Sequence, residues 1–202
     1  MIQLRDVRFR WNREGPFLLD IPEFEVEAGE KVFLEGPSGS GKTSLLNILG
    51  AICPPEHGSV KVNGTDVAKL IGAARDTFRA DHIGIIFQMF NLIPYLSPLD
   101  NIILPCRFSK RRFASAFKRS GIKEEGSRLL AHMQLHEVLN RNSPTFELSV
   151  GQQQRVAAAR SLIGSPELII ADEPTSALDH ETRERFLNLL LEEAANSDIT
   201  LL

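Results

Sequence analysis

The sequence predicts an α/β fold: a mixed, largely parallel sheet with an N-terminal antiparallel β sub-domain and an inserted α-helical sub-domain. The first thirty residues alternate between apolar and polar in short runs, as antiparallel strands with one solvated face do. IGIIF (83–87) and LIIA (168–171) are continuous apolar runs, which favour strands buried on both faces. Between them, residues 98–162 are helical in pattern and rich in polar side chains. Strands that alternate with helices indicate a parallel sheet.

The first elements are expected to be antiparallel strands within IQLRDVRFRW and FEVEAGEKVFLEG, broken at 12–16 and 28–29. VFLEG (32–36) should form a strand that runs into the glycine-rich segment GPSGSGKT. TSLLNILGA follows with helical spacing and a stop at Gly50. GSVKVNG (58–64) has turn residues at both ends and predicts another short strand.

Helices dominate the second half of the sequence. The pattern is helical from Pro98 to about Asn142, and again from Ser149 to about Leu162. After the LIIA strand, residues 181–195 have the spacing of an amphipathic helix. ITLL (199–202) then begins one more strand. Each pair of buried strands is therefore separated by helical segments.

We interpret residues 1–202 as one domain with an insertion. Residues 1–88 and 163–202 form the core together with the antiparallel strands, and about 89–162 form the helical sub-domain. At this length a folded chain buries roughly 70% of the surface that its unfolded form exposes. The fold therefore needs neither a disulfide nor a structural metal.

The composition limits the possible partners. A chain that is 43% hydrophobic and 24% charged is typical of soluble globular proteins. The net charge of -3 gives no global positive field, so no nucleic-acid partner is expected. The start, MIQLRDVRFRW, has charges where a signal peptide has its apolar stretch. No apolar run approaches the ~18 residues of a membrane span, so we expect any role at a membrane to need a partner.

The segment GPSGSGKT matches G-x-x-x-x-G-K-[ST], after an expected strand and before a helix. Its glycines let successive backbone N–H groups turn towards a phosphate, and the helix N-terminus adds a partial positive charge. Lys42 is placed to reach the β- and γ-phosphates, and the Thr43 hydroxyl to ligate Mg²⁺. The pattern predicts a nucleotide site made of Gly36, Pro37, Ser38, Gly39, Ser40, Gly41, Lys42, Thr43 and Ser44.

Two carboxylates follow the LIIA strand. In phosphate-loop proteins an Asp at a buried strand end holds Mg²⁺, which is the role expected of Asp172. Glu173 is not needed for the metal, and a second carboxylate there suits a general base that polarises water towards the γ-phosphate. The alternative is a charged strand end before a turn at Pro174.

Read together, these segments resemble the nucleotide-binding subunits of ABC transporters over nearly the whole chain. GPSGSGKT resembles the Walker A motif, and LIIADEP (168–174) resembles Walker B with its glutamate. LSVGQQQR (148–155) resembles the family signature, SALD (176–179) the D-loop, and Gln88 the Q-loop glutamine. The resemblance implies a P-loop NTPase core and a RecA-like arrangement of residues 1–88 and 163–202.

The resemblance also implies ATP and Mg²⁺ as cofactors and ATP hydrolysis as the activity. Glu173 and Gln88 would be catalytic, and the implied Mg²⁺ ligands are Thr43, Gln88 and Asp172. Two copies would face head to tail, each signature against the ATP of the other. The signature residues in contact with that ATP would be Ser149, Val150, Gly151 and Gln152, and the D-loop residues Ser176, Ala177, Leu178 and Asp179.

Position 150 departs from the family, which usually has glycine there. If Val150 has right-handed helical geometry, valine is favoured over glycine by a few tenths of a kcal/mol. If it needed a positive φ, strain of about 1–2 kcal/mol would follow. Ser149 and Gln152 also have the spacing of a helix capping box, a structural role compatible with ATP contact.

Trp11 is the only tryptophan and lies about twenty-five residues before the phosphate loop, where the family places an aromatic that stacks on adenine. Stacking on a base is worth roughly 1–3 kcal/mol, by analogy with nucleic-acid sites. Phe9 is the neighbouring candidate for this role. Alternatively, Trp11 is only an aromatic at the end of a strand.

Within the family, the segment FQMFNLIPYLSPLDNIILP resembles the lipoprotein-release and macrolide-export branch. Residues 89–108 would then include the groove that docks an integral-membrane permease, after Gln88. This implies an exporter-type system, with the chain peripheral on the cytoplasmic face of the inner membrane. The alternative is a soluble ABC-type ATPase that acts on nucleic acid or ribosomes. The lack of a long coiled coil and of a second cassette disfavours it.

The family has a histidine that contacts the γ-phosphate, just after the strand that follows the D-loop helix. The sequence ends at Leu202 within that strand, and its histidines lie elsewhere, at 57, 82, 132, 136 and 180. A positioned acid–base group contributes about 10²–10⁴ in rate. We therefore expect this stretch to bind Mg-ATP but to turn it over weakly.

Basic and aromatic residues interleave around SKRR (109–112) and Lys118-Arg119. Phe113 and Phe117 have the i, i+4 spacing of an ordinary buried helix face, with the charges in solvent. We expect that arrangement. Contact with acidic lipid or nucleic acid is the alternative.

Overall fold

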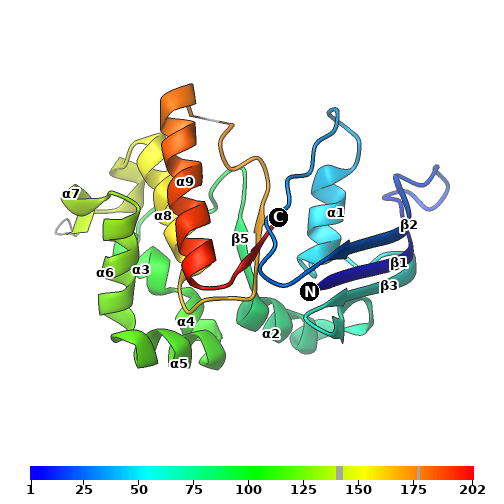
Figure 1. Ribbon diagram of the computed structural model, residues 1–202, viewed down its shortest axis with the longest axis horizontal. Coiled ribbons are helices and arrows are strands. Elements are labelled where there is room, and N and C mark those ends of the chain that lie inside the picture. Colours follow the sequence, from blue (N-terminus) through cyan, green and yellow to red (C-terminus); the bar gives the residue numbers. More distant parts are fainter. Residues whose placement is uncertain (140–142, 177) are drawn as a thin grey trace.

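The computed structural model describes residues 1–139, 143–176 and 178–202 and confirms the α/β fold. Figure 1 shows an antiparallel sheet at one end, a group of helices at the other and a parallel sheet between them. The antiparallel sheet has the order β2-β1-β3-β4, and the parallel sheet has the order β5-β6-β7. This layout places helix α1 between the two sheets.

The antiparallel sheet consists of β1 (Ile2–Phe9), β2 (Leu19–Val26), β3 (His57–Val62) and β4 (Thr65–Asp66). Burial alternates within each half of β1: Ile2 and Leu4 are buried and, after a register shift between Arg5 and Arg8, so are Val7 and Phe9. This is the pattern predicted from the alternating sequence, because successive side chains of a strand point to opposite faces.

The parallel sheet consists of β5 (Ile83–Ile86), β6 (Leu168–Ala171) and β7 (Thr200–Leu201). The predicted strand at 32–36 is only partly formed: Lys31 bridges Leu201, and the Val32 N–H donates to the Leu201 carbonyl at 2.8 Å. Beyond Val32 the described backbone provides residues 33–35 with no ladder partner, and Phe33 is 87% exposed. The length of this strand is therefore set by its hydrogen-bond partners and not by the hydrophobicity of its residues.

The other regular elements of the described residues are helices and two short 3₁₀ turns, at Val67–Lys69 and Thr145–Glu147. The helices are α1 (Lys42–Leu49), α2 (Gly72–His82), α3 (Pro98–Ile103), α4 (Pro105–Phe108), α5 (Lys110–Arg119), α6 (Ile122–His132), α7 (His136–Leu139), α8 (Val150–Leu162) and α9 (His180–Asn196). As expected, α1 ends at Gly50, which caps it. None of the described helices is long and apolar enough to cross a bilayer.

Helix α8 lies at the centre of the helical side. Its residues 156–159 are buried, and it packs against α3, α6, α9 and strand β5. Short side chains at Ala157, Ala158 and Ala159 let these neighbours approach closely. One apolar cluster therefore contains residues of α6 and α8 together with Ile86 and Ile169 of the sheet. The division at residues 89 and 162 stays a prediction, since this core crosses both limits.

The predicted burial of the aromatic face of α5 is wrong. Phe113 and Phe117 are 45% and 65% exposed, and the side chains that α5 buries are Arg112 and Ala116. The Arg112 guanidinium donates to the carbonyls of Ser161 at 2.6 Å and Ile163 at 2.7 Å. Because three α8 and post-α8 carbonyls need a donor, the arginine and not the phenylalanines faces inwards.

Candidate nucleotide site

The phosphate loop connects the extended segment after Lys31 to α1. Gly39 and Gly41 have φ values of 82° and 94°, a left-handed conformation that side chains disfavour. A Cβ at Gly41 would also lie 2.6 Å from Leu19 Cδ2. Glycine is thus required at Gly41 by both backbone and packing. Helix α1 begins at Lys42, so the N–H groups of its first turn have no partner within the helix and face the phosphate loop.

Lys42 folds back over the loop. Its Nζ donates to the carbonyls of Gly36 at 2.7 Å and Pro37 at 3.1 Å. These carbonyls hold the ammonium at the open end of the helix, beside the N–H groups of α1. A positive charge and a helix N-terminus that converge on one loop form an anion site.

Four predicted side chains converge next to this loop, although they come from three distant segments. The Thr43 hydroxyl donates to Asp172 Oδ1 at 3.3 Å, and Gln88 Nε2 donates to Glu173 Oε2 at 3.4 Å. The Asp172 N–H donates to the Ile86 carbonyl at 3.0 Å. That bond places Asp172 directly after β6 and beside the end of β5, where carboxyl ends of parallel strands meet.

Glu173 adopts an unusual backbone conformation, with φ at 47°. A non-glycine residue in this region costs on the order of 1–2 kcal/mol. The turn is held by Ser176, whose N–H donates to the Glu173 carbonyl at 3.2 Å. This conformation turns the Glu173 side chain towards Gln88. The backbone strain is therefore found at the residue expected to act as the general base.

A hollow of about 450 Å³ joins these segments. Its lining includes Gly36 and Lys42 of the phosphate loop and Asp172, Glu173 and Ser176 after β6. Gly36 and Lys42 of the phosphate loop therefore share one accessible space with the residues that follow β6. None of the signature residues 149–152 lines the described part of this hollow.

The donor set suits a hard divalent cation. Thr43 and Asp172 offer a hydroxyl and a carboxylate oxygen 3.3 Å apart, and Mg²⁺ prefers oxygen ligands together with substrate phosphates. These two residues would hold the metal beside the phosphate loop. The Gln88 amide group lies on the Glu173 side, and its nitrogen is oriented towards that carboxylate.

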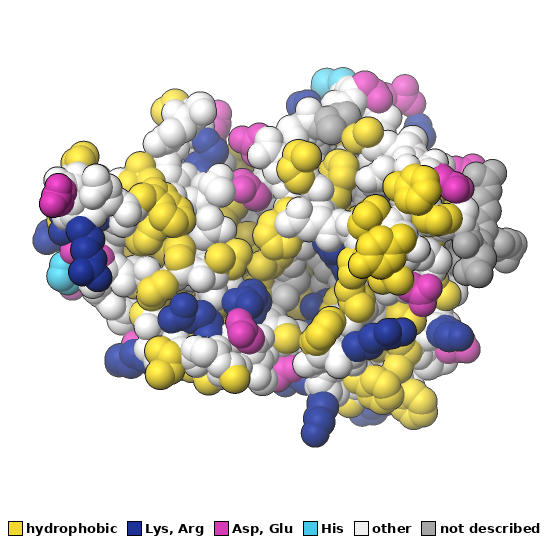
Figure 2. Space-filling model, turned by 180° about the vertical axis from the view of Figure 1, so that it is seen from behind, with side chains coloured by type: hydrophobic (Ala, Val, Ile, Leu, Met, Phe, Trp, Pro, Cys, Tyr) yellow, Lys and Arg dark blue, Asp and Glu magenta, His cyan; other side chains and the backbone are white. Residues whose placement is uncertain are grey.

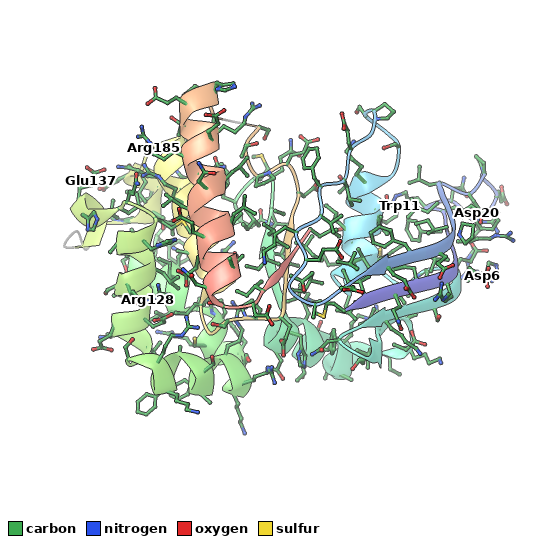
Figure 3. All side chains as sticks on the ribbon, viewed as in Figure 1. Asp6, Trp11, Asp20, Arg128, Glu137 and Arg185 are labelled. Atoms are coloured by element: carbon green, nitrogen blue, oxygen red, sulfur yellow. The ribbon has the colours of Figure 1, made fainter. Side chains whose placement is uncertain are left out.

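Trp11 follows β1 and lies close to the first turn of α1 (Figure 3). Its Nε1–H donates to the Ser44 hydroxyl at 3.1 Å, and the ring is 66% exposed. Phe9 meets the indole edge to face, with centroids 4.9 Å apart, and is itself buried. Of the two aromatic candidates, only Trp11 thus presents a ring to solvent next to the phosphate loop.

The signature begins α8 with a complete capping box. Ser149 Oγ accepts from the Gln152 N–H at 3.3 Å, and Gln152 Oε1 accepts from the Ser149 N–H at 2.9 Å. Val150 is the first helical residue and has no positive φ, so valine carries no backbone strain there. Gln152 also donates from Nε2 to Glu137 at 2.7 Å, which ties its side chain to α7.

The D-loop links this helix start to α9. A Cβ at Gly151 would lie 3.5 Å from Leu178 Cδ2, so the two motifs are in contact within one chain. Asp179 caps α9 by accepting from the Thr182 N–H at 3.0 Å. That backbone bond lowers the pKa of the Asp179 carboxyl. Ser176 forms the turn with Glu173, and Ala177 lies outside the described residues.

The signature and the phosphate loop do not meet. No hydrogen bond within the described part of the chain joins residues 148–152 to residues 36–44. Figure 1 shows α1 and α8 on either side of β5. The N-terminus of α8, where the signature lies, could therefore contact a ligand that is bound to another molecule.

Sequence reasoning missed Arg160. Its guanidinium donates to the carbonyls of Asn91 and Phe90, both at 2.6 Å, and joins the signature helix to the segment after Gln88. Asn91 and Phe90, whose carbonyls accept these bonds, both have positive φ, at 47° and 58°. Burial lowers the pKa of this arginine. Arg160 lies three turns into α8, and nothing in the surrounding sequence indicates which carbonyls it binds.

The comparisons with known proteins agree with this geometry. The family model described as ABC transporter matches residues 19–176. An uncharacterized ABC transporter ATP-binding protein of Mycobacterium tuberculosis, MT0079, is 41% identical over 83% of this chain. The chain spans about half of that relative's length, 48%. MJ0796 of Methanocaldococcus jannaschii, with the same description, is 38% identical over 94% of this chain and 80% of its own length.

Two solved structures of MJ0796 are similar over the whole chain at 34% identity. The one titled a dimeric post-hydrolysis state bound to ADP and Pi has a TM-score of 0.83, with 86% of its chain covered. The other, titled a dimeric bacterial ABC transporter cassette, has a TM-score of 0.81, with 87% covered. The family match, these relatives and the converging motifs lead to one conclusion: the chain is an ATP-binding domain of the ABC transporter family.

Proposed function

We propose that this domain binds Mg-ATP and hydrolyses it to drive an ABC membrane transporter. One observation carries the proposal: Thr43, Gln88, Asp172 and Glu173 come together from three segments beside Lys42. A phosphate site alone would fit any nucleotide-binding protein. The glutamate next to the metal carboxylate, with an amide donor on it, is suited to hydrolysis.

The chain's own groups divide the chemistry between them. Lys42 and the N-terminus of α1 bind the phosphates, and Thr43 with Asp172 positions the metal. Mg²⁺, when bound, neutralises charge on the phosphate oxygens. Glu173 accepts a proton from the attacking water, while Gln88 holds the carboxylate in place. Trp11 stacks on the adenine.

Two copies form the complete site. The capped start of α8 presents Ser149 and Gly151 to an anion, but within one chain it lies away from the phosphate loop. A head-to-tail pair brings each signature to the ATP of the other copy. The dimeric state of both MJ0796 structures supports the pairing of two copies.

A permease of the exporter type docks along the segment after Gln88. A hollow of about 470 Å³ is lined there by Phe87, Asn91, Phe108 and residues of α2. Met89 and Tyr95 on the same segment are largely exposed, as expected of an uncovered interface. Arg160 connects this segment to the signature helix, so docking and ATP contact are linked. The domain then works at the cytoplasmic face of the inner membrane.

The test is ATP-driven association of the Glu173→Gln variant. Glutamine keeps the size of the side chain but cannot accept the proton, so bound ATP persists and the dimer should accumulate. Light scattering after gel filtration at millimolar Mg-ATP should show twice the 22.5 kDa mass of the monomer. The control is Glu173→Gln with Lys42→Ala, which should stay monomeric. A monomeric Glu173→Gln chain under these conditions contradicts the proposal.

A further inference from the structure

Helix α5 presents an outward face that none of the described residues covers. Phe113 and Phe117 stack on each other with centroids 6.1 Å apart and planes 8° apart. Phe113 is 45% and Phe117 65% exposed, and Phe108 just before the helix is 73% exposed. Figure 2 shows, at its lower right, hydrophobic side chains flanked by dark-blue cationic ones. We name Phe108, Lys110, Phe113, Phe117 and Lys118 the α5 face.

The inward side of α5 fixes this orientation. Arg112 is buried and bonded to carbonyls at the end of α8, and a Cβ at Gly164 would lie 2.6 Å from Arg112 Cβ. Ser109 caps the helix by accepting from the Arg112 N–H at 2.9 Å and donates to Asp81. Turning α5 to bury its phenylalanines would leave these bonds unmade. The exposed rings are therefore held outwards by the fold.

The charged residues of the chain segment that contains α5 all have one sign. No Asp or Glu occurs from position 101 to 123, although the whole chain has a net charge of -3. The cations of this stretch are Arg107, Lys110, Arg111, Arg112, Lys118, Arg119 and Lys123. Arg111 and Arg119 pair with carboxylates of other segments. Within the described residues, Arg107, Lys110 and Lys118 have no ion-pair partner.

We propose that the α5 face binds the anionic surface of a lipid bilayer. Lys110 lies one turn before Phe113, at the i, i+3 spacing of helical neighbours, and Lys118 lies on the side of α5 opposite the buried Arg112 and Ala116. Apolar rings that enter the headgroup region beside lysines that meet lipid phosphates are the pattern of interfacial helices.

A nucleic-acid partner suits this face less well. Binding to a nucleic-acid strand relies on a positively charged groove along the strand, and the chain as a whole has a net charge of -3. The rings also project from the surface rather than line a groove, so they offer a protein partner little concave contact. The contact with lipid is predicted to be weak and sensitive to salt, because one short helix supplies it.

The experiment is flotation of the domain with vesicles, without any permease. Vesicles of phosphatidylcholine with about one third phosphatidylglycerol should bind the domain at least about tenfold more strongly than phosphatidylcholine alone. Phe113→Ser with Phe117→Ser, and separately Lys110→Gln with Lys118→Gln, should each lower that binding about tenfold or more. The matched controls, Ile71→Ser and Lys31→Gln with Lys61→Gln, change exposed residues of the same kinds elsewhere and should bind like the unmodified chain.

Unchanged melting temperatures and unchanged stabilisation by Mg-ATP would show that the variants fold and keep their nucleotide site. Equal binding to both kinds of vesicle overturns the proposal. So does full vesicle binding by the phenylalanine or lysine pair of variants. Binding of the α5 face to a single-stranded oligonucleotide, without binding to vesicles, would also refute it. All these results are independent of ATP-driven dimerisation.

Discussion

Ser149 has two roles in this account, and two substitutions separate them. Its hydroxyl caps α8, and the same group faces the ATP of a second copy in the proposed dimer. Alanine removes both functions. Aspartate keeps the cap, since its carboxylate accepts from the same N–H, but it adds a negative charge where the γ-phosphate should lie.

The magnitudes follow from the geometry. Loss of an N-cap costs about 1 kcal/mol, and Gln152 keeps its own bond to the Ser149 N–H, so the cost should not exceed that. In a domain of this size that lowers the melting temperature by about 2–4 °C. A carboxylate about 4 Å from a phosphate charge is repelled by roughly 4 kcal/mol at an effective dielectric of 20. Because the dimer contains two such contacts, dimerisation should weaken about a thousandfold for each, roughly a millionfold in all.

Calorimetry and light scattering in the Glu173→Gln background give the two readouts. Ser149→Ala should melt about 2–4 °C lower. Ser149→Asp should melt like the parent chain, retain stabilisation by Mg-ATP as a monomer, and lose the dimer. A Ser149→Asp chain that dimerises like its parent would refute the placement of the signature against ATP. A Ser149→Asp chain that melts as low as the alanine variant would refute the capping argument.

Three further predictions concern Trp11, Glu173 and Arg160. Mg-ATP should quench the fluorescence of Trp11, the only tryptophan, and Trp11→Ala should weaken ATP binding about tenfold; unchanged emission at saturating Mg-ATP would remove the residue from the site. In urea, the free energy of unfolding should be about 1 kcal/mol higher for Glu173→Gly than for Glu173→Ala, because glycine adopts the φ of 47° without strain. The opposite order would contradict the left-handed turn. Arg160→Gln should increase amide hydrogen exchange at Phe90 and Asn91, because their carbonyls lose the arginine donor. The affinity of the monomer for Mg-ATP should stay within about twofold, since the phosphate loop is untouched. Exchange protection equal to that of the parent chain would exclude the connection from Arg160 to this segment.

Local chemistry made much of the site predictable. The glycine pattern before Lys42 and the buried strand before Asp172 each have a direct physical reason, and the structure brings both to one hollow. The start of α8 followed from the Ser149 and Gln152 spacing, because the capping box depends on neighbours in sequence. Such features involve only a few adjacent residues.

What could not be predicted depends on distant partners. Spacing alone assigned Phe113 and Phe117 to a buried face, but Arg112 reaches carbonyls about fifty residues away and takes that side instead. The strand expected at 32–36 shortened because the described backbone supplies no partner beyond Val32. The link from Arg160 to Phe90 and Asn91 crosses seventy residues. Periodicity does not carry such information.

Complementation between two inactive variants tests the two-copy site most directly. Lys42→Ala removes the phosphate loop's cation, and Ser149→Asp blocks the signature, so neither chain alone should dimerise with Mg-ATP in the Glu173→Gln background. A mixture can form one intact site, with Lys42 from one copy and Ser149 from the other. Resonance energy transfer between differently labelled chains should therefore appear in the mixture upon addition of Mg-ATP. Absence of transfer in the mixture, while the two parent chains associate, would contradict the head-to-tail arrangement.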